Sequence, residues 1–212
     1  LGRFPPGFLT ILPSSPRHVF APAARLLYLV EDELEVGFLG QPLFNLGGRI
    51  TNASGAPMIG VLVTVSSNAA VLGTTLTDQT GNYLFANLPE GRYTVAASKS
   101  GFAFNPPTQE RNLDRDRLSV NFAGSRLFTI GGRITEGADP VRGVVVRIGS
   151  TNVVTDAQGF FLQTLPAGSY PVVPTLIGYQ FTPTQQVATV GPDAPTLNFA
   201  AQTVGFSVRG RI

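Results

Sequence analysis

The chain has 212 residues, a formal net charge of +2 at pH 7 and 43% hydrophobic residues. This balance excludes a disordered chain, because disorder requires low hydrophobicity and high net charge. Cysteine is absent, which excludes disulfides, thiolate metal sites and cysteine nucleophiles.

Two kinds of partner are also disfavoured by the composition. No basic run is interleaved with aromatic residues, as a nucleic-acid groove requires. No uninterrupted apolar run approaches the roughly 18 residues that a membrane span needs. We therefore expect no nucleic acid and no membrane span. Glycine and proline are abundant, with 24 and 17 residues, which is typical of short strands joined by many turns.

The N-terminal stretch resembles at first a proline-rich leader with a helix over residues 23–34. Shifted by 84 residues, however, it aligns with the next part of the chain without a gap. Phe4-Pro5-Pro6-Gly7 falls on Leu88-Pro89-Glu90-Gly91, and Phe20-Ala21-Pro22 falls on Phe104-Asn105-Pro106. Residues 1–42 are therefore predicted to be the C-terminal half of a preceding β-sandwich repeat.

Three further segments share one starting pattern, residues 43–50, 127–134 and 205–212, each ending in Arg-Ile. Thr77-Asp78 and Thr155-Asp156 follow the first two starts at matching places. The sequence thus predicts full β-sandwich repeats over 43–126 and 127–204, and the first strand of a following repeat over 205–212. We expect a longer natural polypeptide. The alternative is a polymer in which neighbouring copies complete the terminal repeats by strand complementation.

Short β-branched or alternating runs indicate strands at residues 61–65, 83–85, 92–97, 118–122 and 144–148. Turn residues rich in Gly, Pro and Asp separate them at intervals typical of a sandwich of about seven strands. Pro171 cannot donate a ladder hydrogen bond, so its strand is expected to be bent, bulged or at a sheet edge.

Both full repeats resemble the carboxypeptidase regulatory-like domain, a transthyretin-like, immunoglobulin-type β-sandwich found in tandem in bacterial surface proteins. The resemblance implies an all-β fold and an extracellular or cell-surface location. It is carried by these residues: Gly48-Arg49-Ile50, Gly55-Ala56-Pro57, Gly60-Val61, Thr77-Asp78, Gly81, Tyr83, Phe85, Leu88-Pro89, Gly91, Tyr93, Val95 and Gly101-Phe102.

No catalytic, cofactor-binding or metal-binding residue is predicted, and the chain is not expected to be an enzyme. The only histidine, His18, occupies the aromatic position of Phe102 and Tyr179 and is expected to be a packed or surface ring. The acidic run Glu31–Glu35 is interpreted as a charged strand edge rather than a calcium loop.

Other polar residues receive similar structural interpretations. Asp78 and Asp156 are expected to accept backbone hydrogen bonds in turns rather than to bind calcium. An isopeptide crosslink is not expected, because Lys99 is the only lysine and lies beside Gly101. Asn52-Ala53-Ser54 matches a glycosylation acceptor, which matters only if the source glycosylates.

The recurring aromatics Phe102, Phe104, Tyr179 and Phe181 are interpreted as core or junction packing rather than as a sugar-stacking site. The leading function is a rigid stalk or filament, since only five residues separate Phe122 from Phe128. Its partners would be neighbouring repeats or copies of the same chain. The alternatives are a carbohydrate-binding or adhesive module, and an accessory region of a secreted hydrolase.

Overall fold

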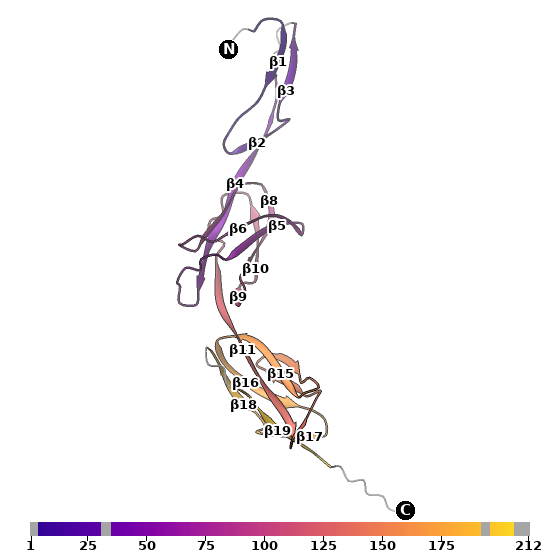
Figure 1. The fold of residues 1–212 in the computed structure, drawn as a ribbon. Coiled ribbons are helices and arrows are strands. Elements are labelled where there is room, and N and C mark those ends of the chain that lie inside the picture. Colours follow the sequence, from indigo (N-terminus) through magenta and orange to yellow (C-terminus); the bar gives the residue numbers. More distant parts are fainter. Residues whose placement is uncertain (1–3, 31–34, 192–195, 206–212) are drawn as a thin grey trace, which may run out of the picture. The chain divides into compact units, whose positions relative to one another are not determined.

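The computed structural model describes residues 4–30, 35–191 and 196–205 (Figure 1). Its regular elements are all β-strands, and the predicted all-β fold is confirmed. The chain divides into two compact units. The first comprises Leu1–Lys99 with Phe104–Gly124, and the second comprises Ser100–Ala103 with Ser125–Ile212.

The N-terminal strands of the first unit contribute no buried side chain to its core. β1 (Gly7–Ile11) pairs antiparallel with β3 (Arg25–Leu29), so the stretch considered as a helix contains a strand. β2 (His18–Ala21) pairs with the beginning of β4 (Leu39–Asn52). No described side chain before Leu46 is buried, so these strands stand apart from the core that follows.

The rest of the first unit is a β-sandwich of two sheets. One sheet has the strand order β10-β8-β5-β6, and in the other β4 pairs with β7 and with the start of β11, which also pairs with β9. Leu46, Ile50, Val63, Val95 and Leu113 are completely buried between them. The strands are β5 (Leu62–Ser67), β6 (Ala70–Leu76), β7 (Asn82–Pro89), β8 (Gly91–Ser98), β9 (Phe102–Asn105), β10 (Thr108–Leu113) and β11 (Phe122–Glu136).

The second unit repeats this arrangement. One sheet has the order β14-β13-β16-β18, and in the other β11 pairs with β15 and β19, while β17 pairs with β19. Its core includes Ile130, Ile134, Val146 and Phe161. The strands are β12 (Asp139–Pro140), β13 (Val145–Ile148), β14 (Thr151–Val154), β15 (Phe160–Pro166), β16 (Gly168–Thr175), β17 (Tyr179–Thr182), β18 (Gln186–Val190) and β19 (Phe199–Thr203).

The Gly-Gly-Arg motif that begins each full repeat has a steric cause. A Cβ on Gly48 would lie 2.1 Å from the carbonyl oxygen of Val120. A Cβ on Gly132 would lie 1.7 Å from that of Leu197. Only glycine therefore allows the two backbones to approach this closely.

The structure differs from the predicted strands in two details. β16 is flanked by β13 and β18, so the strand that contains Pro171 is neither at a sheet edge nor bulged. Its two neighbours are staggered: Pro171 lies in the ladder with β18 and Pro174 in the ladder with β13. Within the strand ladders, each proline therefore has a paired neighbour on one side only.

The predicted strand over residues 118–122 is regular only from Phe122 onward. Its earlier part lies along β4 through the bridge from Leu46 to Arg117 and the hydrogen bond from Val120 N to Gly47 O. At the next position the side chain of Asn121 accepts the hydrogen bond from Arg49 N at 2.8 Å. A side-chain oxygen thus replaces a backbone partner, and the ladder is interrupted there.

Candidate functional site

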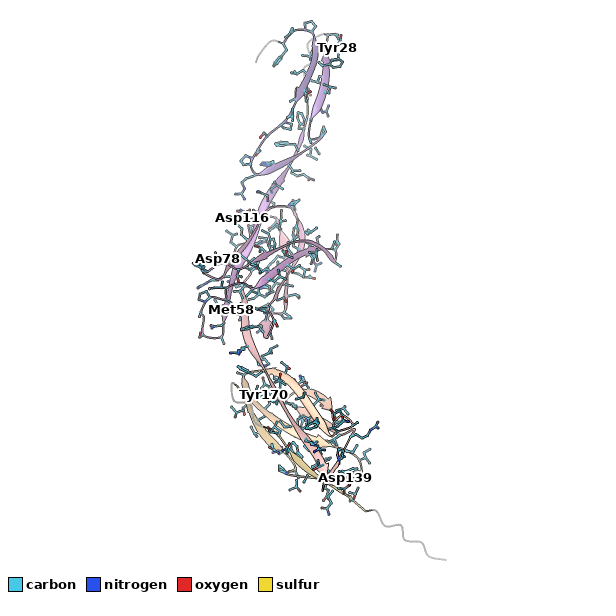
Figure 2. The ribbon with its side chains drawn as sticks, viewed as in Figure 1. Tyr28, Met58, Asp78, Asp116, Asp139 and Tyr170 are labelled. Carbon is cyan, nitrogen blue, oxygen red and sulfur yellow. The ribbon has the colours of Figure 1, made fainter. Side chains whose placement is uncertain are left out.

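A buried threonine closes the sandwich in both units. The Oγ1 of Thr77 donates to the carbonyl oxygen of Met58 at 2.6 Å and accepts from Val61 N at 2.9 Å (Figure 2 labels Met58). Thr155 makes the same two bonds, to Val141 O and from Val144 N. The sequence repeat places both threonines at matching positions, but their role as a bridge between two backbone groups was not predicted.

The two turn aspartates behave as predicted. Asp78 Oδ1 accepts hydrogen bonds from Thr80 N at 2.8 Å, Thr80 Oγ1 at 2.7 Å and Asn82 N at 2.9 Å. The Thr80 hydroxyl bond, followed by the backbone bonds, lowers the pKa of Asp78. Asp156 Oδ1 accepts from the backbone N–H groups of Gln158 and Phe160. Both carboxylates stabilise turns.

A second polar network also occurs twice. Arg49 Nε donates to Thr80 O, and Arg133 Nε donates to Gln158 O. In the same way, Asn198 accepts from Arg133 N as Asn121 does from Arg49 N. These side chains bind the backbone of their own unit.

The recurring aromatics are partly or fully covered by the fold. Phe102, Phe104 and Tyr179 are half-buried, and Phe181 is buried. Tyr179 and Phe181 stack with ring centroids 6.5 Å apart. Their burial supports the packing interpretation over a sugar-stacking surface.

The remaining candidates have local roles. The exposed ring of His18 lies 3.1 Å from Ser15 Oγ and begins β2, as Phe102 begins β9 and Tyr179 begins β17. Lys99 Nζ donates to Ile59 O at 2.5 Å. Asn52 Oδ1 accepts from Ser54 N, Ser54 Oγ and Ala56 N, so the carboxamide of the glycosylation acceptor caps its own loop.

The part of the chain that the structure describes contains no group of three or more His, Asp or Glu side chains able to hold a metal ion. Of the acidic run Glu31–Glu35, all but Glu35 lies outside the described residues. The same holds for the predicted strand 205–212, except Gly205. No helix in the described ranges is long and apolar enough to cross a membrane.

An exposed ion pair joins the N-terminal strands to the sandwich of the first unit. Arg17 Nη2 lies 2.7 Å from Asp116 Oδ1, which also accepts from Asn45 N at 2.8 Å. The bond from Asn45 N and then that from Arg17 lower the pKa of Asp116. The carboxylate of Asp116 is thus bonded to groups of its own unit.

The outer face of β8 and β10 carries a shallow hollow lined by Arg92, Glu110, Arg111 and Asn112. Arg92 pairs with Glu110, and Arg111 donates to Gln109. Its charges therefore pair with side chains of the same two strands, and this hollow carries no separate chemistry.

The fold is similar to that of a streptococcal ancillary pilin, with a TM-score of 0.42 and 15% identity. The match covers 94% of this chain and 76% of that chain. The fold is also similar to that of the shaft pilin SpaA of Lactobacillus rhamnosus GG, with a TM-score of 0.36, 11% identity, 78% of this chain and 100% of that chain covered.

In sequence the chain is 34% identical, over 178 residues, to the chitinase ChiA of Flavobacterium johnsoniae. The match covers 79% of this chain but only 11% of the relative's length. Residues 45–123 match the carboxypeptidase regulatory-like domain. They coincide with the first full sandwich and include all of the residues that suggested the resemblance. The resemblance to the carboxypeptidase regulatory-like domain expected from the sequence is therefore confirmed over residues 45–123.

Proposed function

We propose that the chain is a non-catalytic structural repeat region of a larger extracellular protein, in which tandem β-sandwiches form a rigid stalk or filament. One observation carries this proposal: the same internal bonds occur in both units. Thr77 and Thr155 bridge the same two positions, and Asp78 and Asp156 close the same turn. Equivalent polar side chains therefore stabilise the sandwich in each of the two units.

The proposed organisation is a C-terminal half-repeat over 1–42, full repeats over 43–126 and 127–204, and the first strand of another repeat over 205–212. The strand positions support it. β1 and β8 begin at Gly7 and Gly91, and β2 and β9 begin at His18 and Phe102, both 84 residues apart.

One backbone hydrogen bond also recurs at, or one residue before, the start of each of the three proposed repeats that begin at 43, 127 and 205. Leu43 N donates to Arg17 O at 2.9 Å, Leu127 N to Gly101 O at 2.8 Å and Val204 N to Gly178 O at 2.7 Å. The three donors are separated by nearly one repeat length. This recurrence supports three copies of one boundary.

Electron microscopy of the native material tests the stalk or filament. We expect thin rods or filaments whose axial repeat corresponds to a few domain lengths. Filaments with density that runs past both ends of the chain would favour a continuous or strand-complemented polymer. Compact particles, or flexible chains of separate beads, would contradict a rigid spacer.

A second candidate is an accessory region that contacts polysaccharide for a secreted hydrolase. The observation that favours it is the match to a segment of a chitinase. Because the match spans 11% of that protein, it bears on an accessory region and assigns no chitinase activity to this chain. Both candidates place the chain outside a bacterial cell.

A further inference from the structure

The most exposed aromatic side chains of the described residues all lie in the N-terminal segment, between residues 4 and 28. Phe8 of β1 is 77% exposed and Tyr28 of β3 is 62% exposed, while the preceding Phe4 is 61% exposed. Phe8 and Tyr28 are directly opposite each other, with ring centroids 4.8 Å apart and planes inclined by 48° (Figure 2 labels Tyr28). Two rings thus form one exposed surface.

The register decides which face of the sheet carries these rings. Opposite residues of an antiparallel pair project to the same face, and successive residues alternate. Phe8, Thr10, Leu26 and Tyr28 therefore share one face, which we call the ring face. Leu9, Ile11, Leu27 and Leu29 lie on the other face or its edge, together with Arg25.

The equivalent sheet in the first full sandwich shows which of these faces points to solvent. Leu9 and Ile11 correspond to Tyr93 and Val95 of β8, which are buried in the core. Phe8 and Tyr28 correspond to the opposite pair Arg92 and Asn112, which are exposed. A core placed over Leu9 and Ile11 would leave the ring face in solvent.

Packing therefore does not explain two aromatic rings at these positions. The second unit gives the same comparison, since the pair in this place is Ser169 and Thr189, both exposed. Where the two full sandwiches have polar pairs, the N-terminal sheet has Phe8 and Tyr28. Exposed apolar patches of this kind mark binding surfaces.

We propose that the ring face binds the pyranose rings of an uncharged polysaccharide. The ring face carries no charged side chain, so it suits a neutral ligand. The C–H groups on one face of a pyranose ring are apolar and slightly positive, and they complement the negative face of an aromatic ring. The hydroxyl groups of Thr10 and Tyr28 supply hydrogen bonds beside the rings. This inference rests on the second candidate function.

Retention on chitin particles and on microcrystalline cellulose tests the proposal. The variant Phe8→Ser with Tyr28→Thr installs the polar pair of the second unit, so the strands keep residues known at this position. We expect the unaltered chain to bind at least one polysaccharide. The variant should bind about tenfold or more weakly, because two stacked rings are lost.

Two further variants control the experiment. Arg92→Ala changes the equivalent position of the first sandwich and should leave retention unchanged. Ser169→Phe with Thr189→Tyr installs the ring pair in the second unit and should increase retention. Circular dichroism should be the same for all forms, since every substituted residue is exposed.

Three outcomes would overturn the proposal. If the unaltered chain binds neither polysaccharide, the ring face is not a sugar site. The proposed stalk or filament is not affected by that result, because electron microscopy tests it independently. If the unaltered chain and the variant Phe8→Ser with Tyr28→Thr bind equally, the polysaccharide contact lies elsewhere. If sedimentation shows a dimer that Phe8→Ser with Tyr28→Thr abolishes, the ring face binds a second copy of the chain.

Discussion

Thr77 illustrates how a single polar atom can hold two loops in an apolar core. Its side chain is 4% exposed, and its hydroxyl satisfies both Met58 O and Val61 N. Thr77→Val keeps the shape but leaves both backbone groups unsatisfied. We expect the free energy of unfolding of the first unit to fall by about 1–3 kcal/mol, measured by denaturant titration.

Two variants check this assignment. Thr77→Ser retains the hydroxyl and should recover much of the loss, and Thr155→Val should destabilise the second unit by a similar amount. Equal stability of the valine and serine variants would show that the hydroxyl bridge contributes little.

Gly48 provides a steric test at the same scale. Gly48→Ala forces a Cβ to within 2.1 Å of Val120 O, so the backbones of two neighbouring segments must separate. We expect a loss of about 3 kcal/mol or more in the free energy of unfolding. Gly73→Ala is the matched control, because its Cβ would meet nothing closer than 3.9 Å. Similar stabilities of the two alanine variants would contradict the close approach.

At the scale of elements, the turn between β6 and β7 should make stability depend on pH. Hydrogen bonds to its carboxylate lower the pKa of Asp78 from the ordinary value of 3.8. A lowered pKa stabilises the fold at pH values above 3.8, and this contribution is lost as the pH falls through the folded-state pKa.

Asp78→Asn removes the titrating group but keeps an oxygen acceptor. We expect the difference in denaturation midpoint between the parent chain and this variant to be largest near neutral pH. It should shrink as the pH falls below 3.8 and the parent carboxylate becomes protonated. A difference that stays constant with pH would mean that the charge of Asp78 does not stabilise the turn.

Strand existence was more predictable than strand pairing. The run at 92–97 lies within β8 because its alternation reflects one buried face. Of the bent, bulged or edge strand expected for Pro171, the structure excludes the edge and the bulge, because the stagger of β13 and β18 is a property of three strands together. Likewise, a side chain replaces a ladder partner at Asn121, which no period in the sequence reveals.

The ring face was within reach of the sequence but was not identified. The 84-residue shift already aligns Phe8 with Arg92 and Tyr28 with Asn112. What the sequence lacked was the register that makes each pair face solvent, which requires the opposite strand. Phe102 and Tyr179 stand out in the sequence because an aromatic residue recurs at their position. Phe8 and Tyr28 differ, because the equivalent positions of the full repeats are polar.

At the scale of the whole molecule, each unit has a core of its own. Leu46, Ile50 and Val63 are buried in the first, and Ile130, Ile134 and Val146 in the second. In repeat proteins stability is approximately a sum over units and their neighbours, so damage to one core should remain local. Gly132→Ala should therefore unfold the second unit and leave the first folded.

Hydrogen exchange read by mass spectrometry can measure this for each unit separately. With Gly132→Ala, peptides from β13 and β16 should lose protection while those from β5 and β8 keep it, and Gly48→Ala should give the reverse. This reciprocal pattern is expected because the carbonyl oxygens that meet the added Cβ, those of Leu197 and Val120, belong to different units. Loss of protection in both units from either substitution would mean that the chain unfolds as one cooperative body, and a spacer of separately stable sandwiches would be excluded.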